Sequence, residues 1–385
     1  MEHATQVRLA RTLLDHVESG APLRNDAVAA VPARNYTDVE HLAAETARVL
    51  GPLPQMVALT GDVPNPGSYV VRELPGASVV IARDTDGAVH ASVNACRHRG
   101  ARVVEDRGTG RRLTCPYHSW TYRPDGTLAG IPDAESFAGF DADGCRLPQL
   151  PVAEVAGTIW VVPDGTGSLD ADRVRRELGP FVDDFEAIAT ADHAHWRNRR
   201  FELDLNWKLV VDTFLEPYHL GSLHRDSVGP YFHSNLCTID QHGDHVREVL
   251  PRRTITELRD LAEEEWDLIS RSTVVYSLFP ATVFVIQMDR IETWRVRPVE
   301  GDPGRCIADL DFYIHPERLQ ERPERYWERN WELTVGTVLD EDFTAMAGVQ
   351  ANLAAGHLDR LTFGRNEPAL TIFHHALAAR VGEAP

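Results

Sequence analysis

Two short segments of the chain each pair one cysteine with one histidine. Cys96 and His98 lie two residues apart, and Cys115 and His118 follow after sixteen intervening residues. Zinc fingers usually group cysteine with cysteine and histidine with histidine. One thiolate and one imidazole on each segment instead suit a cluster of two irons and two sulfides, in which both cysteines bind one iron and both histidines the other. A structural zinc site of the Cys2His2 type is the alternative.

A second set of candidate ligands follows further along the chain. His219 and His224 are five residues apart, roughly 140° on an ideal helix, so they could share a metal only if the helix ends or bulges at Gly221. Glu216 and Asp212 precede His219 by about one and two turns, which would place two carboxylates and an imidazole on one stripe. Two neutral histidines and one carboxylate form the facial triad of non-haem Fe(II) oxygenases, which leaves positions open for O2.

Both sets resemble the motifs of one known family. The cluster-binding loops of the Rieske oxygenase large subunits look like CRHRGA (96–101) and CPYHSWTYRPDGTLAGIP (115–132), and the catalytic-iron motif looks like NWKLVVDTFLEPYHLGSLH (206–224). Family members usually have Gly where Ser119 stands and often have Asn where Thr213 stands. The chain therefore resembles the large (α) catalytic subunit of a Rieske non-haem iron oxygenase, in the aromatic-ring-hydroxylating family.

This resemblance implies a role for each candidate residue. The two cysteines and two histidines of the first set would bind a [2Fe-2S] cluster, and His219 and His224 would bind a mononuclear Fe(II). The family's third iron ligand is an aspartate in an acidic pair that opens a downstream amphipathic helix. Asp342 matches it, and Asp340 is the nearest competitor.

Glu216 and Asp212 are the expected catalytic carboxylates. In the family an acid links a cluster histidine of one subunit to an iron histidine of its neighbour in a homotrimer. By motif position this link would run from His118 through Glu216 to His219. A carboxylate bonded to both imidazoles would fix their orientation and raise their basicity.

The chain carries no recognisable reductase. It has no G-x-G-x-x-G motif after a strand and no C-x4-C-x2-C motif of plant-type ferredoxins. Electrons are therefore expected from NAD(P)H through a separate reductase, with or without a ferredoxin.

The remaining sequence predicts an α+β protein. Residues 1–51 look helical, and short β-branched runs with Gly and Pro breakers predict an all-β Rieske [2Fe-2S] domain over 52–165. Residues 166–385 alternate helices with strands, which predicts helices packed on an antiparallel sheet. The Rieske domain would thus be inserted in a catalytic domain of the helix-grip, START-like kind that the resemblance implies. One helix is expected from Trp207 through His219.

One face of the sheet between residues 273 and 297 is expected to line the substrate pocket. The candidate pocket residues of this sheet are Tyr276, Phe284, Ile286, Met288 and Trp294, and Tyr231 and Phe232 join them from near the iron motif. Such a lining suits a small aromatic or partly apolar substrate, although a cage for a quaternary ammonium is an alternative. The expected reaction is hydroxylation or oxidative demethylation by an oxidoreductase. Ring cis-dihydroxylation and a Rieske electron carrier without oxygenase activity are the alternatives.

Composition restricts the partners. The 385 residues carry 39 basic and 58 acidic side chains, so the formal net charge is 39 − 58 = −19. Such a charge disfavours binding to nucleic acid or to anionic membranes. Five cysteines in a long chain do not suggest a disulfide framework, and no segment has the apolar length of a membrane span. A cytoplasmic protein is expected.

Overall fold

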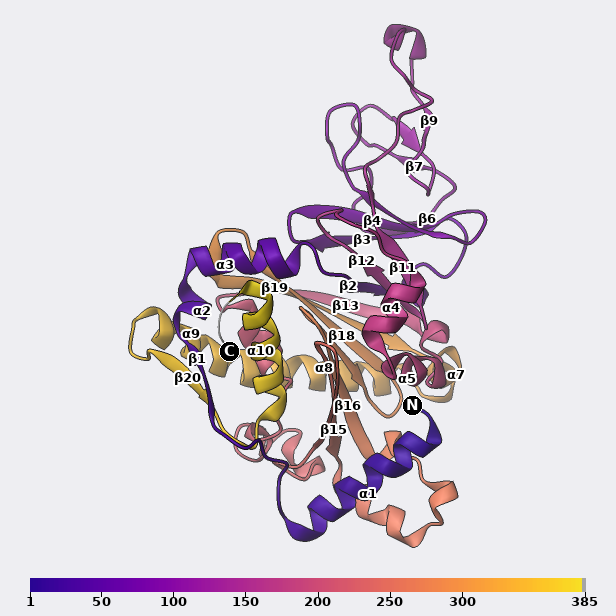
Figure 1. Cartoon of the computed structure of the whole chain (residues 1–385). Coiled ribbons are helices and arrows are strands. Elements are labelled where there is room, and N and C mark those ends of the chain that lie inside the picture. Colours follow the sequence, from indigo (N-terminus) through magenta and orange to yellow (C-terminus); the bar gives the residue numbers. More distant parts are fainter. Residues whose placement is uncertain (383–385) are drawn as a thin grey trace. The chain divides into compact units, whose positions relative to one another are not determined.

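The computed structural model describes residues 1–382, which divide into two compact units (Figure 1). Unit 2 comprises Leu50–Glu177 and Ala189–Ala194. Unit 1 comprises Met1–Val49, Leu178–Ile188 and the chain from His195 onward. The segment predicted as all-β therefore lies within unit 2, and the predicted limits at residues 52 and 165 stay a proposal.

Unit 2 is built from three small antiparallel sheets. Their strand orders are β10-β5-β4-β3-β6, β11-β12-β2 and β7-β8-β9. The elements are β2 (Gln55–Leu59), β3 (Ser68–Leu74), β4 (Ala77–Arg83), β5 (Val89–Val93), β6 (Arg107–Thr109), β7 (Leu113–Thr114), β8 (Thr121–Tyr122), β9 (Leu128–Gly130), β10 (Gln149–Leu150), β11 (Val152–Val155), β12 (Thr158–Val161) and α4 (Ala171–Leu178).

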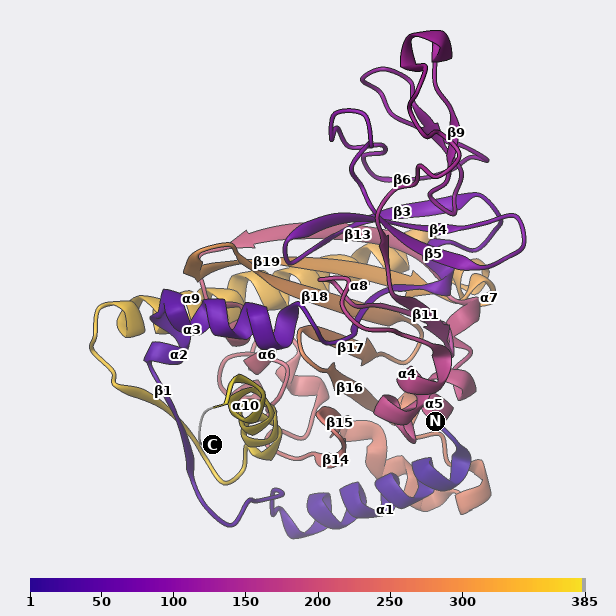
Figure 2. The same cartoon turned by 45° about the horizontal axis from the view of Figure 1, so that its top comes forward.

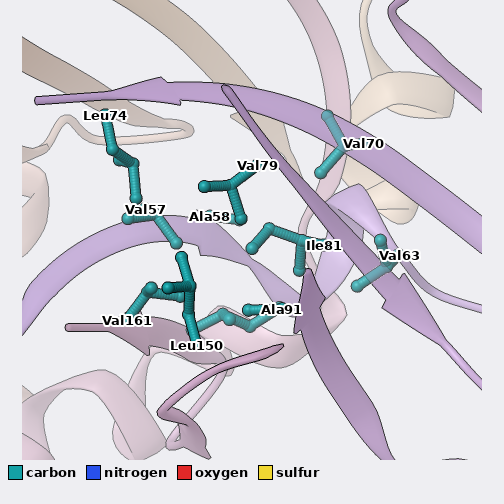
Figure 3. Close-up of a cluster of buried hydrophobic side chains, with 11 residues drawn as sticks. Val57, Ala58, Val63, Val70, Leu74, Val79, Ile81, Ala91, Leu150 and Val161 are labelled. Atoms are coloured by element: carbon teal, nitrogen blue, oxygen red, sulfur yellow. The ribbon is translucent and has the colours of Figure 1, made fainter. Parts of the chain in front are cut away.

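A single apolar core joins two of these sheets (Figure 3). Along β3 buried and half-buried residues alternate, as a strand with one inward face requires. Val70, Val79 and Ile81 point inward from the five-stranded sheet and meet Val57 and Val161 from the three-stranded sheet. A second buried cluster, which includes Val80 and Ala82 of β4, contains Cys96 and Cys115 of the candidate loops.

Unit 1 contains a seven-stranded antiparallel sheet in the order β13-β19-β18-β17-β16-β15-β14. Its strands are β13 (Ala194–Leu203), β14 (Thr238–His242), β15 (His245–Pro251), β16 (Ser272–Leu278), β17 (Thr282–Ile286), β18 (Ile291–Val299) and β19 (Asp302–Ile314). Figure 2 shows β19 to β15 fanning across the unit. A separate pair joins β1 (Ala29–Pro32) to β20 (Arg360–Phe363). The predicted α+β class is confirmed.

Helices cover both faces of this sheet. On one face Phe185 of α5 lies 4.8 Å from Phe284 between ring centroids, and on the other Trp331 of α8 lies 4.9 Å from Phe312. The helices of unit 1 are α1 (His3–Ser19), α2 (Arg34–Thr37), α3 (Val39–Glu45), α5 (Phe181–Ala187), α6 (Trp207–Asp212), α7 (Pro316–Glu321), α8 (Glu324–Gly336), α9 (Thr344–Ala354) and α10 (Pro368–Val381). Within residues 1–382 every helix is too short or too polar to cross a membrane.

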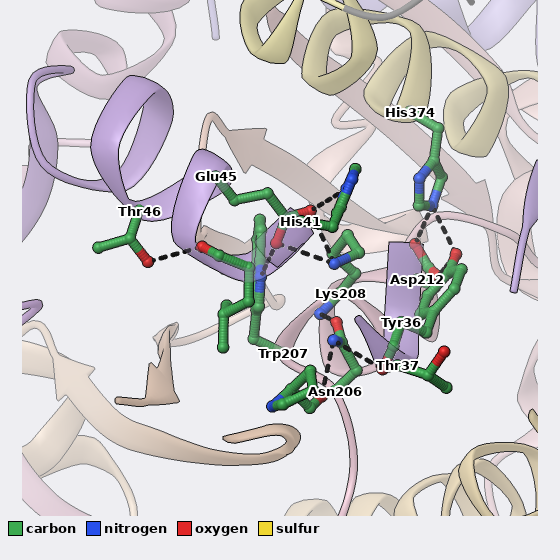
Figure 4. Close-up of polar contacts among 12 residues, drawn as sticks. Tyr36, Thr37, His41, Glu45, Thr46, Asn206, Trp207, Lys208, Asp212 and His374 are labelled. Carbon is green, nitrogen blue, oxygen red and sulfur yellow. Dashed lines mark hydrogen bonds and ion pairs between the residues drawn. The ribbon is translucent and has the colours of Figure 1, made fainter. Parts of the chain in front are cut away.

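A buried polar network fixes α6, the helix that precedes the two histidines (Figure 4). Asn206 caps the helix by accepting a hydrogen bond from the backbone N–H of Lys208, 3.0 Å away. Lys208, the only lysine of the chain, lies 2.7 Å from Glu45 of α3, and Trp207 donates its indole N–H to the same carboxylate at 2.9 Å.

The charge of Glu45 survives burial because of these partners. Burial raises the pKa of Glu45, but the Lys208 ammonium and hydrogen bonds from His41, Lys208 and Trp207 outweigh burial and hold that pKa below its usual range. A buried carboxylate that stays ionised needs its cation close by. The Lys208–Glu45 ion pair therefore holds α6 against α3.

The helix predicted from Trp207 through His219 is wrong in length, because α6 ends at Asp212. Pro217 prevents the helix from continuing through His219. Proline has no N–H for a helical bond, and it pushes the preceding residue, here Glu216, away from helical angles. Thr213 also turns its hydroxyl back to the Val210 carbonyl, 2.8 Å away. Residues 213–224 are consequently free to fold into tight turns.

Lys208→Met is expected to destabilise unit 1 by about 3–5 kcal/mol, because it leaves the Glu45 carboxylate buried without its cation. Equilibrium unfolding in guanidinium chloride measures this change. The double variant Glu45→Gln/Lys208→Met should recover most of the loss, since neither partner is then charged. A single variant within 1 kcal/mol of the parent would show that the pair does not anchor α6.

Candidate metal centres

Three side chains of unit 1 converge on one point: His219, His224 and Asp342. The Nε2 atoms of the two histidines are 3.1 Å apart. The Asp342 Oδ1 atom lies 3.1 Å from Nε2 of His224 and 3.5 Å from Nε2 of His219. This oxygen is buried and has no hydrogen-bond partner in the described part of the chain. Two imidazoles and one carboxylate therefore present free lone pairs to a common centre.

His219 is oriented by the turn that replaces the expected helix. It opens a short 3-10 segment, η5 (His219–Gly221), and its backbone N–H donates to Glu216 Oε2 at 3.1 Å. The same carboxylate accepts the N–H of Tyr218 at 2.5 Å and contacts Nδ1 of His219 through its other oxygen. A carboxylate can only accept here, so Nδ1 carries the proton and Nε2 keeps its lone pair.

His224 is held in the same manner by Glu341, a residue that the sequence does not single out. Its Nδ1 donates to Glu341 Oε2 at 2.5 Å, and Ser227 donates its hydroxyl to the same oxygen at 2.8 Å. Burial lowers the pKa of His224, whereas Asp342 and Glu341 raise it, and the net shift is upward. The two carboxylates thus favour a positive charge beside His224, whether a proton or a metal ion.

Asp342 reaches the site from a π-helical segment, η10 (Thr337–Phe343), which lies between α8 and α9. Such widened turns inside α-helices often occur at functional sites. Within this segment Asp342 is buried, whereas Asp340, its predicted competitor, is exposed. Asp340 is also absent from the converging group.

The donor set fits ferrous iron. Two neutral imidazoles and one carboxylate on one side of a metal leave its other positions free, which is the arrangement of non-haem Fe(II) oxygenases. Each imidazole is fixed through Nδ1 by a carboxylate, Glu216 or Glu341, as is usual for histidine ligands. Glu341 and Ser227 could have been suspected only from the acidic pair at 341–342 and from the short separation between residues 224 and 227.

The four candidates of the first set lie together in unit 2. Cys96 and Cys115 are buried and free, and Tyr122 approaches Cys96 Sγ with its hydroxyl at 3.3 Å. The rings of His98 and His118 are 4.6 Å apart between centroids. Nδ1 of each histidine is buried without a hydrogen-bond partner in residues 1–382. Two imidazole nitrogens are therefore available for a metal next to two thiols.

Their spacing favours a cluster over a single ion. Ligand atoms around one tetrahedral zinc would lie within about 3.8 Å of one another, given zinc–ligand bonds of ~2.0–2.3 Å. No three of these four side chains bring their ligand atoms within 4.8 Å in the described part of the chain. A two-iron, two-sulfide cluster separates its cysteine pair from its histidine pair and so fits this wider arrangement.

Ser119, where the family usually has glycine, adopts a left-handed backbone with φ of 58°. Its N–H donates to the Cys115 carbonyl at 3.0 Å, and the Cys115 N–H donates to the Trp120 carbonyl at 2.9 Å. The turn thus keeps its hydrogen bonds with serine in place, although this conformation favours glycine.

The triad in unit 1 opens onto a cavity of about 470 Å³. Non-aromatic side chains of β15, β16 and β17 line part of it, namely Leu250, Thr273, Val275 and Val285. Polar residues also line it: Arg252, Gln287, Arg290, Glu292, Arg329 and Asn330. The cavity is therefore only partly apolar.

Three of the seven predicted pocket residues, Tyr231, Phe232 and Met288, line this cavity. The prediction is wrong for Tyr276, Phe284 and Ile286, which point to the opposite face of the sheet. The first two pair across β16 and β17 and pack on α5, with Phe185 lying 5.1 Å from Tyr276. The sequence shows which residues of each strand share a face, but not which face lines the cavity. In the structure the face with the bulky rings packs in the core, and the face with smaller residues leaves room for a ligand.

Trp294, also predicted for the pocket, is a core residue. It is fully buried and packs against Phe201, Phe214 and Phe343 with ring centroids 5.4–5.9 Å away. Its side chain does not line the cavity.

The expectation that Asp212 is a catalytic carboxylate also needs correction, because Asp212 does not line the cavity. It accepts hydrogen bonds from His374 at 2.9 Å and from the Tyr36 hydroxyl at 3.1 Å (Figure 4). Because α6 ends at Asp212, this residue no longer shares a stripe with Glu216 and His219. Its contacts tie α6 to α2 and α10.

Comparison with known proteins agrees with these two sites. Residues 190–383 match the model of the ring hydroxylating alpha subunit catalytic domain, and residues 54–151 match that of the Rieske [2Fe-2S] domain. The chain belongs to the family of ring hydroxylating alpha subunits, and it carries their Rieske domain. A [2Fe-2S] cluster and a mononuclear iron are the cofactors that this membership implies, as predicted.

Among individual relatives, the oxygenase subunit of carnitine monooxygenase from Escherichia coli K12 is 32% identical over 203 residues, which are 50% of this chain and 52% of that protein. The match thus spans about half of the relative. The chloroplastic choline monooxygenase of Spinacia oleracea is 23% identical over 326 residues, which are 84% of this chain and 71% of the relative.

Two solved structures share the fold. A quaternary ammonium Rieske monooxygenase in complex with L-carnitine superposes with a TM-score of 0.77 at 22% identity, over 92% of this chain and 96% of the other. Naphthalene 1,2-dioxygenase from Rhodococcus sp. gives a TM-score of 0.74 at 18% identity, over 98% and 99% of the two chains.

Proposed function

We propose that this chain is the catalytic subunit of a Rieske oxygenase that hydroxylates or oxidatively demethylates a small substrate. The observation that carries this proposal is the occurrence of two unlike donor sets on one chain, one of which opens onto a cavity of about 470 Å³. A Rieske electron carrier would need neither the triad nor the cavity.

Each donor set has an assigned role in this proposal. Cys96 and Cys115 with the two histidines of unit 2 hold the cluster, and His219, His224 and Asp342 hold Fe(II). When bound, the cluster supplies single electrons and the ferrous ion supplies open positions for dioxygen. Glu216 and Glu341 keep the Nδ1 protons in place, so that both imidazoles present Nε2 inward. The cavity wall keeps the substrate next to the triad.

A quaternary ammonium substrate replaces the aromatic one expected from the sequence. The relatives at higher identity are named for carnitine, and others for choline. The cavity supports this choice, because three aromatic side chains, Tyr231, Phe232 and Tyr326, line it and aromatic rings attract cations. The naphthalene dioxygenase fold keeps ring dihydroxylation as the second candidate. Three arginines and two glutamates in the lining make a hydrocarbon a poorer fit.

Electron supply and assembly complete the proposal. A separate NAD(P)H-dependent reductase, with or without a ferredoxin, would reduce the cluster, and three copies would form a ring. Glu216 would then link His219 to His118 of a neighbouring copy. The five free thiols within residues 1–382 are compatible with the cytoplasm, and the net charge of −19 with an absence of nucleic-acid partners.

Isotope labelling tests the reaction. The iron- and sulfide-reconstituted protein, a surrogate reductase and NADH are exposed to 18O2 with carnitine, choline, γ-butyrobetaine or naphthalene. A trimethylammonium compound should give a product that carries one 18O atom, or the aldehyde and amine that follow from it. The matched control, His219→Ala, should retain the visible spectrum of the cluster and form no product. Two 18O atoms in a naphthalene diol would support the second candidate instead.

Glu216→Gln tests the proposed electron link. The amide can still accept the backbone N–H groups of Tyr218 and His219, so both metal sites should fill. Without the carboxylate, product formed in a single turnover of the pre-reduced protein should fall at least about tenfold. Glu341→Gln is the matched control, because Glu341 orients His224 in the same way and is assigned no link. Equal losses in the two variants would contradict a special role for Glu216.

A further inference from the structure

Arg252 is a half-buried arginine of the cavity lining whose charge no carboxylate of the described residues neutralises, whereas Arg329, which also lines the cavity without such a partner, is exposed. Arg252 follows β15 and lines the cavity. Its Nη2 donates to Gln287 Oε1 at 2.9 Å and to the Thr273 hydroxyl at 3.2 Å, and its Nε lies 3.4 Å from the Ser272 carbonyl. Within residues 1–382 no carboxylate oxygen lies within 4.0 Å of this guanidinium, and its Nη1 has no hydrogen-bond acceptor.

The buried arginines of the chain differ from Arg252, because each of them has a carboxylate partner. All five that are buried have a carboxylate oxygen within 3.0 Å: Arg72, Arg83, Arg247, Arg290 and Arg297. Removing a guanidinium from water is costly unless an anion accompanies it. Burial, and then the nearby charge of Arg290, lower the pKa of Arg252. Arg252 thus lacks the partner that this fold supplies elsewhere.

The neighbours of Arg252 hold its direction without cancelling its charge. Gln287 Oε1 also accepts the Thr273 hydroxyl at 3.0 Å, so the amide is fixed from two sides. The guanidinium carbon lies 4.9 Å from the centre of the Phe232 ring, which restricts rotation on the other side. A guanidinium held in this manner is prepared to bind a planar anion through two N–H groups.

We propose that Arg252 is the specificity-determining residue of the cavity and that it binds a carboxylate group of the substrate. None of its contacts includes His219, His224 or Asp342, so anion binding and metal binding use separate parts of one cavity. This inference rests on the proposed function, and it narrows the substrate class. A compound with an ammonium group and a carboxylate should be preferred over a neutral alcohol or amide of equal size.

Matched acid and amide ligands test this assignment. Isothermal titration under anaerobic conditions is carried out on the iron- and sulfide-loaded protein with γ-butyrobetaine and its primary amide, and with benzoate and benzamide. Wild-type protein should bind at least one acid about 10- to 100-fold more tightly than its amide, which is the usual contribution of a hydrogen bond to a charged group. In Arg252→Gln this preference should disappear while the affinity for the amide stays unchanged.

Two further variants separate charge from geometry. Arg252→Lys keeps the charge but cannot form the paired bonds, so it should retain part of the preference. Arg259→Gln removes an arginine that pairs with Glu18 outside the cavity lining, and it should bind both ligands as wild type does. Should Arg252→Gln fail to fold, the partial loss in Arg252→Lys decides the matter.

Three results would overturn the assignment: no acid binds to the wild type, acid and amide bind equally well, or Arg252→Gln keeps the preference. Product formation is scored separately in the same samples. A preference for the acid without any oxygenated product would leave the anion site standing and refute the oxygenase activity.

Discussion

The site in unit 1 depends on holding three electron-rich atoms against their mutual repulsion. Nε2 of His219, Nε2 of His224 and Oδ1 of Asp342 lie within 3.5 Å of one another, and each bears a lone pair that faces the others. A proton or a metal cation between them removes the repulsion. The surrounding structure must keep the three atoms converged, because nothing in their own chemistry does so.

Several layers of the fold meet this requirement. Glu216 and Glu341 hold the outer nitrogens of the imidazoles, and the widened turn of η10 directs Asp342 inward. Behind them the buried Lys208–Glu45 pair secures α6, from which the turn with the histidines departs. On the other side, small residues of the sheet leave the space that becomes the cavity. The contacts of Glu216 and Glu341 therefore set the geometry of the three ligands, and the packing around them leaves the volume for a substrate.

The sequence was sufficient where ligand positions follow from short spacing. Cys96, His98, Cys115 and His118 could be grouped because two strand-loop units each present a thiol and an imidazole, and the fold class followed from the change in periodicity along the chain. Spacing alone separates His219 and His224 on an ideal helix, and the resemblance to the family's iron motif placed them in one site. The helix in fact ends ahead of both histidines, at Asp212, and Pro217 prevents it from continuing through His219.

Other features could not be read because they depend on tertiary context. Alternation along a strand does not say which of its faces lines a cavity, so the sequence alone does not show that Tyr276 and Phe284 belong to the core. Glu341 and Arg252 acquire meaning only from partners far away in the chain, His224 and Gln287. The helical stripe expected to join Asp212 to Glu216 and His219 does not form, because the helix ends at Asp212.

The central claim is that one chain holds two different iron centres. Iron and acid-labile sulfide are counted in anaerobically reconstituted protein, with Asp342→Ala and Asp340→Ala measured in parallel. The account predicts three irons and two sulfides per chain for the wild type and for Asp340→Ala, and two irons with the cluster spectrum unchanged for Asp342→Ala. Two irons in the wild type, or zinc in place of iron, would contradict it.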